Sequence, residues 1–285
     1  MQIRTLSWLQ VSIKELLNYG KAQVDSVDAE LLLAHILGVS RMELHSRVIE
    51  LPSENLEQIG KDYRELLAIR RTGRPTQYIT GSAPFRYLEY EVGEGVLIPR
   101  PETELLVDEV LHQLQKFDEP VSIVDLGAGA GGISIALATE TFGKKEPRII
   151  AVEKSDEALE WLKRNIAKHE ADIRVVHGDA ADALMGIKCD VVVANPPYLP
   201  ENIEVPEELA FEPDLALYGG VRGVEIPAIF IESATRLLKS GGFLAIEHHE
   251  DQGKVLAQLL SENFRDIRLH LDLNKRPRFT TAWRL

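Results

Sequence analysis

Apolar residues in the first eighty positions recur three and four residues apart, which is the spacing of one helix face. The first apolar stretch ends at Gly20 and the second at Gly38, while the third stops before Gly73 and Pro75. The apolar positions are Ile13, Leu16 and Leu17, then Ala29, Leu32, Leu33 and Ile36, then Leu56, Ile59, Tyr63, Leu66 and Leu67. The pattern predicts a domain over residues 1–80 that is a small bundle of short amphipathic helices.

The periodicity changes near residue 84. Residues 85–92 are rich in β-forming side chains and partly alternate between apolar and polar, and residues 96–98 are apolar after two glycines. We expect residues 81–98 to form a β-hairpin that links two domains. Residues 99–104 read Pro-Arg-Pro-Glu-Thr-Glu and begin a helix that extends to about Phe117.

After Pro120, short apolar runs alternate with stretches of helical periodicity. The expected strands are 122–126, 148–152, 174–177, 190–194 and 243–247, with later β-like runs at 267–271 and 280–284. The expected helices lie near 132–141, 156–169, 226–239 and 251–263. This alternation is typical of a parallel sheet covered by helices on both faces. We therefore predict an α/β domain over residues 99–285 with a Rossmann-like sheet, mostly parallel, that closes with an antiparallel C-terminal hairpin.

A glycine-rich turn follows the first of these strands. Gly127, Gly129 and Gly132 fit the G-x-G-x-x-G spacing of dinucleotide sites, whereas Gly127, Gly129 and Gly131 fit the tighter G-x-G-x-G of methyl-donor sites. Glu153 lies just past the second strand, where a carboxylate can accept hydrogen bonds from both hydroxyls of a ribose. The turn thus indicates an adenosine cofactor.

Two carboxylates, Asp125 and Asp179, lie where they could contact the adenosine cofactor and so bear on its identity. Asp125 precedes the turn, where a carboxylate would be unfavourable beside a pyrophosphate but would suit the sulfonium and ammonium groups of S-adenosylmethionine. Asp179 lies just past the third strand and can either accept a hydrogen bond from an adenine amino group or cap a helix. Both roles of Asp179 remain open from the sequence.

The apolar strand 190–194 ends in Asn195-Pro196-Pro197-Tyr198. Two prolines stop the ladder and fix the backbone at the edge where open α/β sheets bind ligands. The Asn195 oxygen and the Pro196 carbonyl can both accept hydrogens from one NH₂ group, which favours a nitrogen whose lone pair points at a methyl donor. The Tyr198 ring can stack on a flat substrate group. The alternative is a rigid turn with Tyr198 packed beneath it.

Composition and charge exclude several classes of protein. The chain has 32 Lys and Arg against 45 Asp and Glu, and residues 81–285 carry the whole net charge of −13. This acidity argues against stable binding to nucleic acid. Its single cysteine, Cys189, allows no intramolecular disulfide and no cysteine cage for zinc, so we expect no metal. No membrane span or secretory signal is apparent, and a cytoplasmic location is expected.

The chain thus contains both the glycine-rich turn and the tetrad Asn195-Pro196-Pro197-Tyr198. With the two together, it resembles the PrmC/HemK family of class I methyltransferases, which methylate the glutamine N5 of peptide-chain release factors. The resemblance also includes residues 97–104, 211–213, 216–220 and 241–244, and so it spans nearly the whole chain. It implies S-adenosylmethionine as cofactor and the Gly-Gly-Gln loop of release factors as substrate. It also implies that the helical domain and the hairpin grip the rest of the factor.

The resemblance implies roles for particular residues. The cofactor would be bound by Asp125, Gly127, Ala128, Gly129, Ala130, Gly131, Glu153, Asp179, Ala180 and Asn195. The glutamine amide would be bound by Asn195, Pro196, Pro197 and Tyr198, of which Asn195, Pro196 and Tyr198 would be catalytic, with Arg100 in the active-site wall. From the sequence, Arg100 can contact substrate or pair with Glu102 or Glu104. Ala128, Ala130, Ala180 and Arg222 depart from residues common in relatives, which bears on affinity rather than on the reaction.

Three other functions compete with this one. A nucleic-acid N6-adenine methyltransferase would share the tetrad but would need a cationic approach for its substrate. A nicotinamide dehydrogenase would use the wider glycine spacing, and a non-enzymatic scaffold would have no need of an intact tetrad. A monomer is the simplest expectation for the oligomeric state.

Overall fold

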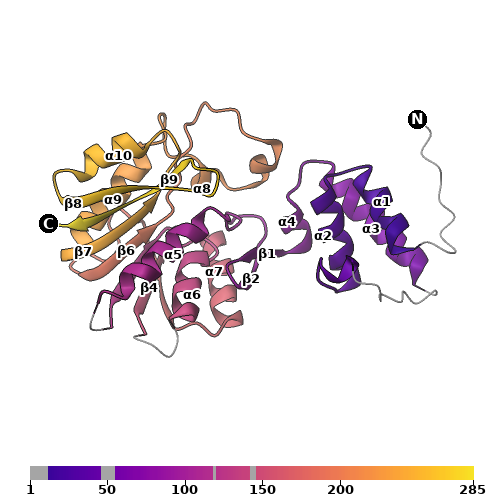
Figure 1. Cartoon of the computed structure of the whole chain (residues 1–285), viewed down its shortest axis with the longest axis horizontal. Coiled ribbons are helices and arrows are strands. Elements are labelled where there is room, and N and C mark those ends of the chain that lie inside the picture. The colour runs from indigo at the N-terminus through magenta and orange to yellow at the C-terminus, as the bar shows by residue number, and fades with distance from the viewer. Residues whose placement is uncertain (1–11, 46–54, 118–119, 142–145) are drawn as a thin grey trace. The chain divides into compact units, whose positions relative to one another are not determined.

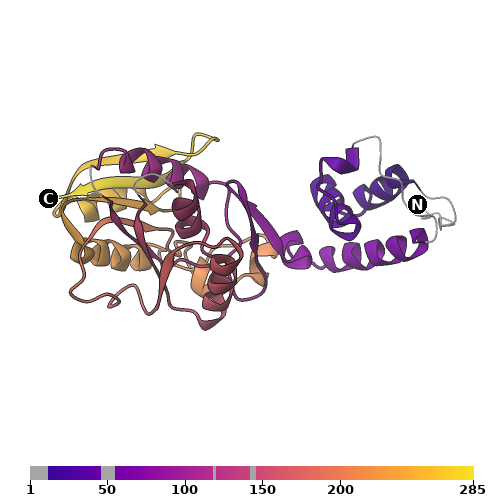
Figure 2. The same cartoon turned by 90° about the horizontal axis from the view of Figure 1, so that it is seen from below.

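The computed structural model describes residues 12–45, 55–117, 120–141 and 146–285. The chain forms two compact units, which are Met1–Gly81 with Pro206–Phe211, and Ser82–Val205 with Glu212–Leu285. Figure 1 colours the elements along the chain, and Figure 2 shows them from below. Within the described ranges, every helix is too short or too polar to cross a membrane.

The first unit is helical, as predicted. Its elements are α1 (Ile13–Lys21), α2 (Ser26–Leu37), η2 (Glu43–His45), α3 (Leu56–Arg70), α4 (Thr76–Thr80) and η3 (Glu207–Phe211). Tyr63 of α3 is fully buried and its hydroxyl donates to the Ala29 carbonyl at 2.8 Å. A Cβ on Gly20 would lie 1.9 Å from this hydroxyl, so the glycine lets α1 pack closely against α3. Most of the apolar positions that predict the helices thus meet in one core, which includes Leu16, Leu32, Leu33 and Leu67.

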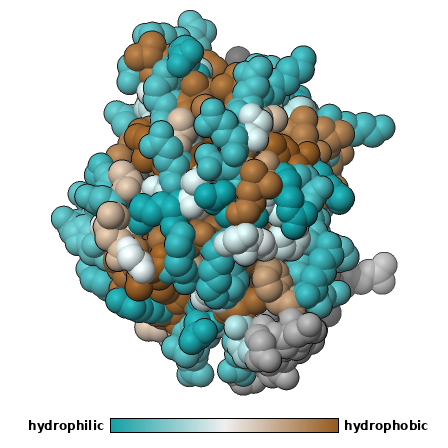
Figure 3. Space-filling model, turned by 90° about the vertical axis from the view of Figure 1, so that its left-hand side faces the viewer, coloured by the Kyte–Doolittle hydropathy of each residue, from teal (hydrophilic) through white to brown (hydrophobic). Residues whose placement is uncertain are grey.

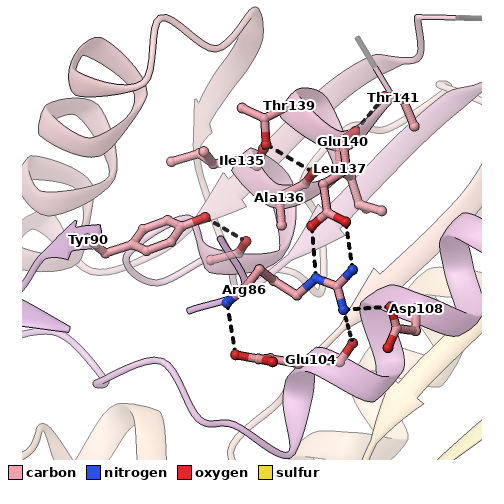
Figure 4. A network of polar contacts seen from close by, with 11 residues as sticks. Arg86, Tyr90, Glu104, Asp108, Ile135, Ala136, Leu137, Thr139, Glu140 and Thr141 are labelled. Carbon is pink, nitrogen blue, oxygen red and sulfur yellow. Dashed lines mark hydrogen bonds and ion pairs between the residues drawn. The ribbon is translucent and has the colours of Figure 1, made fainter. Parts of the chain in front are cut away.

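A β-hairpin begins the second unit. Its strands, β1 (Ser82–Phe85) and β2 (Leu88–Glu91), are antiparallel and joined at Arg86. Figure 4 shows that Arg86 reaches two helices: its guanidinium pairs with Glu140 of α6 and with Asp108 of α5, each at 2.6 Å. The Tyr90 hydroxyl donates to the carbonyl at the start of α6, 3.2 Å away. These contacts attach the hairpin to the body of the second unit.

The second unit is built on a seven-stranded sheet in the order β5-β4-β3-β6-β7-β9-β8. The strands are β3 (Ser122–Leu126), β4 (Arg148–Glu153), β5 (Ile173–His177), β6 (Cys189–Ala194), β7 (Leu238–Glu247), β8 (Phe264–Leu271) and β9 (Pro277–Arg284). The pairs from β5 to β7 are parallel, and β9 is antiparallel to both β7 and β8. The prediction of a mostly parallel sheet with an antiparallel C-terminal hairpin is confirmed.

Helices cover both faces of this sheet (Figures 1 and 2). They are α5 (Thr103–Leu114), α6 (Gly132–Glu140), α7 (Asp156–Lys168), α8 (Asp214–Leu217), α9 (Glu225–Leu237) and α10 (Gly253–Leu260). Alternate strand residues such as Val124, Val192 and Leu244 pack with Phe230 of α9 and Leu256 of α10 in one apolar core. The strand residues between them face the opposite layer, because successive side chains in a strand point to opposite faces.

The outer surface shows how this core is screened from water. Figure 3 shows a face on which hydrophilic side chains predominate and smaller apolar areas lie among them. The exposed apolar residues of the C-terminal elements are Val255, Leu259, Leu269 and Leu271. Single exposed apolar side chains of this kind are common on globular proteins.

Candidate active site

A cavity of about 360 Å³ opens in the second unit at the carboxyl ends of β3, β4 and β6. β3 lies between β4 and β6, so the chain reverses its direction across the sheet at this strand. Open α/β sheets bind ligands at such a switch point, and the volume is in the range of small-molecule sites. The walls are mostly apolar. The predicted residues on them are Arg100, Gly127, Ala128, Gly129, Ala130, Glu153, Asp179, Ala180, Asn195 and Pro197.

The glycine turn forms one side of the cavity, and its three glycines differ in what surrounds them. Gly127, Gly129 and Gly131 have φ angles of 72°, 55° and 89°, which disfavour other residues. A Cβ on Gly129 would meet no protein atom within 4 Å, whereas one on Gly131 would lie 2.8 Å from Ile135 and Leu162. Gly129 therefore opens onto the cavity, while Gly131 faces the core and is not on the cavity wall.

Glu153 holds the turn from the end of β4. Its Oε2 accepts a hydrogen bond from the Gly129 N–H at 2.8 Å, and its Oε1 accepts from the N–H groups of Lys154 and Ser155 at 2.7 and 2.8 Å. The side chain is only 8% exposed and lines the cavity. A carboxylate offers about four acceptor positions, so one remains on Oε2 for a ligand hydroxyl.

Asp125 lies beneath the turn and away from the cavity. Its side chain is fully buried, and its Oδ2 accepts a hydrogen bond from the Ser134 hydroxyl of α6. Its Oδ1 has no hydrogen-bond partner among the described residues, and burial raises its pKa to about 7. The sequence suggested that this carboxylate would meet cofactor charges directly. The structure turns it toward α6 instead, because alternation along β3 places it opposite Val124 and Leu126.

Asp179 has the capping role, which is one of the two roles that the sequence left open. Its Oδ1 accepts from the Ala181 N–H at 2.9 Å and so caps the following turn, and its Oδ2 pairs with Lys154 at 2.7 Å. These hydrogen bonds hold the pKa of Asp179 below its usual range. Asp179 and Ala180 both line the cavity.

The tetrad begins at Asn195, directly after β6. The Asn195 Nδ2 donates to the Thr103 Oγ1 at 3.2 Å, and Asn195 and Pro197 line the cavity. Pro196 is buried and is not on the cavity wall. In the described chain, no backbone N–H bonds to its carbonyl. The tetrad therefore presents the Asn195 amide and a proline ring to the cavity.

Tyr198 is held away from the cavity wall. Its hydroxyl donates to Glu247 Oε1 at 3.1 Å, and its carbonyl accepts from Gln252 Nε2 at 2.8 Å. Burial and the neighbouring Glu247 carboxylate raise the pKa of this phenol. Tyr198 therefore does not line the cavity, and Asn195 and Pro197 are the tetrad residues that do.

Arg100 belongs to the cavity wall, and its partner is distant in the sequence. Its guanidinium pairs with Glu212, whose other carboxylate oxygen accepts from the Ile98 N–H at 2.9 Å. The sequence offered Glu102 or Glu104 as the partner, because these carboxylates are close in the chain. Glu212 instead joins residues 98–100 to the segment before α8.

The sequence pattern predicts no role for Thr103 or Glu247. Thr103 is 4% exposed and lines the cavity, and its hydroxyl donates to the buried Glu247 Oε2 at 2.6 Å. One signal was available, since Glu247 ends the apolar strand 243–247 next to the switch point. A carboxylate at the end of a buried strand needs a partner or a function.

Comparisons with known proteins concern the family of the chain. Residues 102–209 match the Methyltransferase small domain family, and residues 8–81 match the PrmC N-terminal domain family. The release factor glutamine methyltransferase of Streptomyces coelicolor is 40% identical over 264 residues, which cover 90% of this chain and 89% of that protein. The Escherichia coli protein of the same name is 34% identical, with 96% of each chain covered.

A solved structure supports the fold. The T. thermophilus 16S rRNA N2 G1207 methyltransferase (RsmC), in complex with AdoMet and guanosine, is similar with a TM-score of 0.50 at 18% identity. The match covers 72% of this chain and 50% of that one, and at this identity it concerns the fold alone. The family follows from the relatives, which match from the helical unit through the sheet: the chain belongs to the family of release factor glutamine methyltransferases.

Proposed function

We propose that this protein transfers a methyl group from S-adenosylmethionine to the side-chain amide nitrogen, N5, of the glutamine in the Gly-Gly-Gln loop of peptide-chain release factors. One observation carries the proposal: the glycine turn with Glu153 and the amide of Asn195 line the same cavity. The family's name identifies a release factor as the substrate of its relatives.

The cavity fits S-adenosylmethionine. The Gly129 backbone opens onto space in which a ligand can approach closely, and Glu153 retains an acceptor position for a ribose hydroxyl. Ala180 and Phe230 supply apolar wall on which an adenine ring can pack. When bound, S-adenosylmethionine supplies a methyl group on a positively charged sulfur, which a nitrogen lone pair can attack.

The tetrad can make the amide nitrogen of the glutamine a better nucleophile. An amide nitrogen attacks poorly because its lone pair is delocalised into the carbonyl. We assign two acceptors for the two amide hydrogens of the glutamine: the Asn195 Oδ1 on the cavity wall, and the Pro196 carbonyl just behind it, to which no backbone N–H of the described chain bonds. Acceptors out of the amide plane favour a tetrahedral nitrogen, and because they are fixed in advance they lower the barrier by orientation and electrostatics.

The same acceptors handle the proton. The nitrogen becomes cationic as it gains the methyl group, and its hydrogens become strongly acidic. One of them can then leave the nitrogen along its hydrogen bond to an acceptor oxygen and pass to water, so no strong base is needed. Pro197 offers a flat wall for the amide, and Arg100, held by Glu212, helps shape the entrance.

The experiment is transfer of radiolabelled methyl from S-adenosylmethionine to a purified release factor. The matched controls are the same factor with its Gly-Gly-Gln glutamine replaced, and single-stranded and duplex DNA. We expect label on the intact factor only. Label on DNA would favour the adenine alternative, and equal label on the factor without the glutamine would show that another residue is modified.

A further inference from the structure

The first and last residues of the tetrad are connected through one buried carboxylate. Glu247 ends β7, which runs parallel to β6 with Ile246 paired to Ala194, so Glu247 and Asn195 leave neighbouring strands at the same level. The Glu247 side chain is 1% exposed and is not on the cavity wall. Its Oε1 accepts from Tyr198 at 3.1 Å and its Oε2 accepts from Thr103 at 2.6 Å.

The hydrogen bonds in this network have a fixed direction. A threonine hydroxyl has one proton, and an ionised carboxylate can only accept, so the Thr103 proton points to Glu247. The Thr103 oxygen can then only accept from Asn195, which must turn its NH₂ group toward it, at 3.2 Å. The Asn195 Oδ1 consequently lies on the side of the amide away from Thr103.

We propose that Thr103 and Glu247 are positioning residues that orient the Asn195 amide with its oxygen toward the glutamine NH₂ group. The inference rests on the proposed function, because it takes the glutamine NH₂ group as the donor that the Asn195 oxygen receives. If the Asn195 amide were flipped, its NH₂ group would face the NH₂ group of the glutamine, and both are hydrogen-bond donors. The glutamine would then bind without its nitrogen lone pair directed at the methyl group. The network fixes the correct orientation before substrate arrives, which lowers the cost of reaching the transition state.

Protonation of Glu247 removes this direction. A neutral carboxyl carries a proton of its own and can donate to Thr103, whose hydroxyl is then free to donate to Asn195. The pKa of Glu247 is raised to about 7, mainly by burial and to a lesser extent by Glu102, before α5. The hydroxyls of Thr103 and Tyr198 and the positive charge of Arg278 on β9 act in the opposite direction. The orienting form of the network is thus the one that predominates above about pH 7.

The test compares Thr103→Val, which keeps the shape and removes the hydroxyl, with Thr103→Ser, which keeps the hydroxyl. We expect Thr103→Val to lower kcat on the release factor by roughly 10- to 100-fold, the scale of a misplaced catalytic group. Its calorimetric affinity for S-adenosylmethionine should be unchanged, and Thr103→Ser should restore most of the rate. Wild-type kcat should fall as the pH drops below about 7, and a folded Glu247→Gln should lose that fall.

The outcomes separate the inference from the function. If Thr103→Val turns over within about twofold of wild type, or if Thr103→Ser is as slow as Thr103→Val, the positioning role is overturned while the proposed function stands. A wild-type protein that labels no release factor overturns the proposed function and the inference with it. Because the two threonine variants carry the test, a Glu247→Gln protein that fails to fold does not remove it.

Discussion

Replacing Gly129 and Gly131 one at a time by alanine should separate ligand binding from stability. The two glycines are two residues apart and both have positive φ angles, so simple strain would affect them alike. Their surroundings differ, because the added methyl group at 129 enters open space on the cavity wall and the one at 131 enters the core. We expect Gly129→Ala to fold and bind S-adenosylmethionine poorly, and Gly131→Ala to be unstable.

The magnitudes follow from the backbone and the contacts. A left-handed conformation costs an alanine roughly 1–2 kcal/mol, which is the whole expected loss of stability for Gly129→Ala. At 131 the Cβ would also lie 2.8 Å from the methyl groups of Ile135 and Leu162, and overpacking of this kind adds roughly 1–3 kcal/mol. A methyl group between the turn and the ligand should weaken binding at least ~10-fold, or about 1.4 kcal/mol.

Urea unfolding without ligand and calorimetry with S-adenosylmethionine would measure the two effects. Gly186→Ala is a matched control, since Gly186 has a φ of 79°, no atom within 4 Å of an added Cβ, and no place on the cavity wall. It should lose about as much stability as Gly129→Ala and bind normally. The reasoning is refuted if Gly129→Ala binds with wild-type affinity, or if Gly131→Ala is no less stable than Gly186→Ala.

Three further substitutions test separate parts of the site. Glu153→Ala should weaken S-adenosylmethionine binding by ~1–3 kcal/mol, the cost of an unpaired hydrogen-bonding site, and unchanged calorimetric affinity would remove Glu153 from the site. Because the pKa of Asp125 is raised to about 7 in the folded protein, its contribution to stability is present below about pH 4 and is lost as the pH rises through 7. The free energy of unfolding of Asp125→Asn minus that of wild type should therefore rise by on the order of 2 kcal/mol between pH 5 and pH 8 in urea titrations. A difference that does not change with pH would contradict this. Arg86→Met should destabilise the fold by about 3 kcal/mol because it leaves the largely buried Glu140 carboxylate without its cation, and a loss below ~1 kcal/mol would show that solvent screens the pair.

The parts of the site that could be predicted from sequence are those that follow strands directly. The glycine turn, Glu153 and Asn195 each come at the end of an apolar run, and parallel strands bring their carboxyl ends to one edge. The strand order therefore predicts that these residues lie around one cavity, and they do. Asp125 was different, because whether a strand residue faces a cavity or a helix depends on the layer above it.

Partners far apart in the chain could not be predicted. Arg100 pairs with Glu212, more than a hundred residues away, and Thr103 reaches Glu247 across the sheet. These contacts depend on where α5 and the segment before α8 pack. The start of β7 was also missed: a helix was expected near 226–239 and a strand over 243–247, but the strand begins at Leu238, where it pairs with Cys189 of β6. The division into domains at residues 80 and 98 stays a prediction.

The proposed chemistry depends on the tetrad acting on a substrate while the glycine turn holds the methyl donor. The most direct test is the initial rate of methyl transfer by Asn195→Ala at saturating S-adenosylmethionine, with donor affinity measured on the same preparation. We predict that the variant folds, binds the donor, and transfers methyl to the release factor at least ~100-fold more slowly, the scale of one transition-state contact. Near-normal turnover by Asn195→Ala would contradict the account.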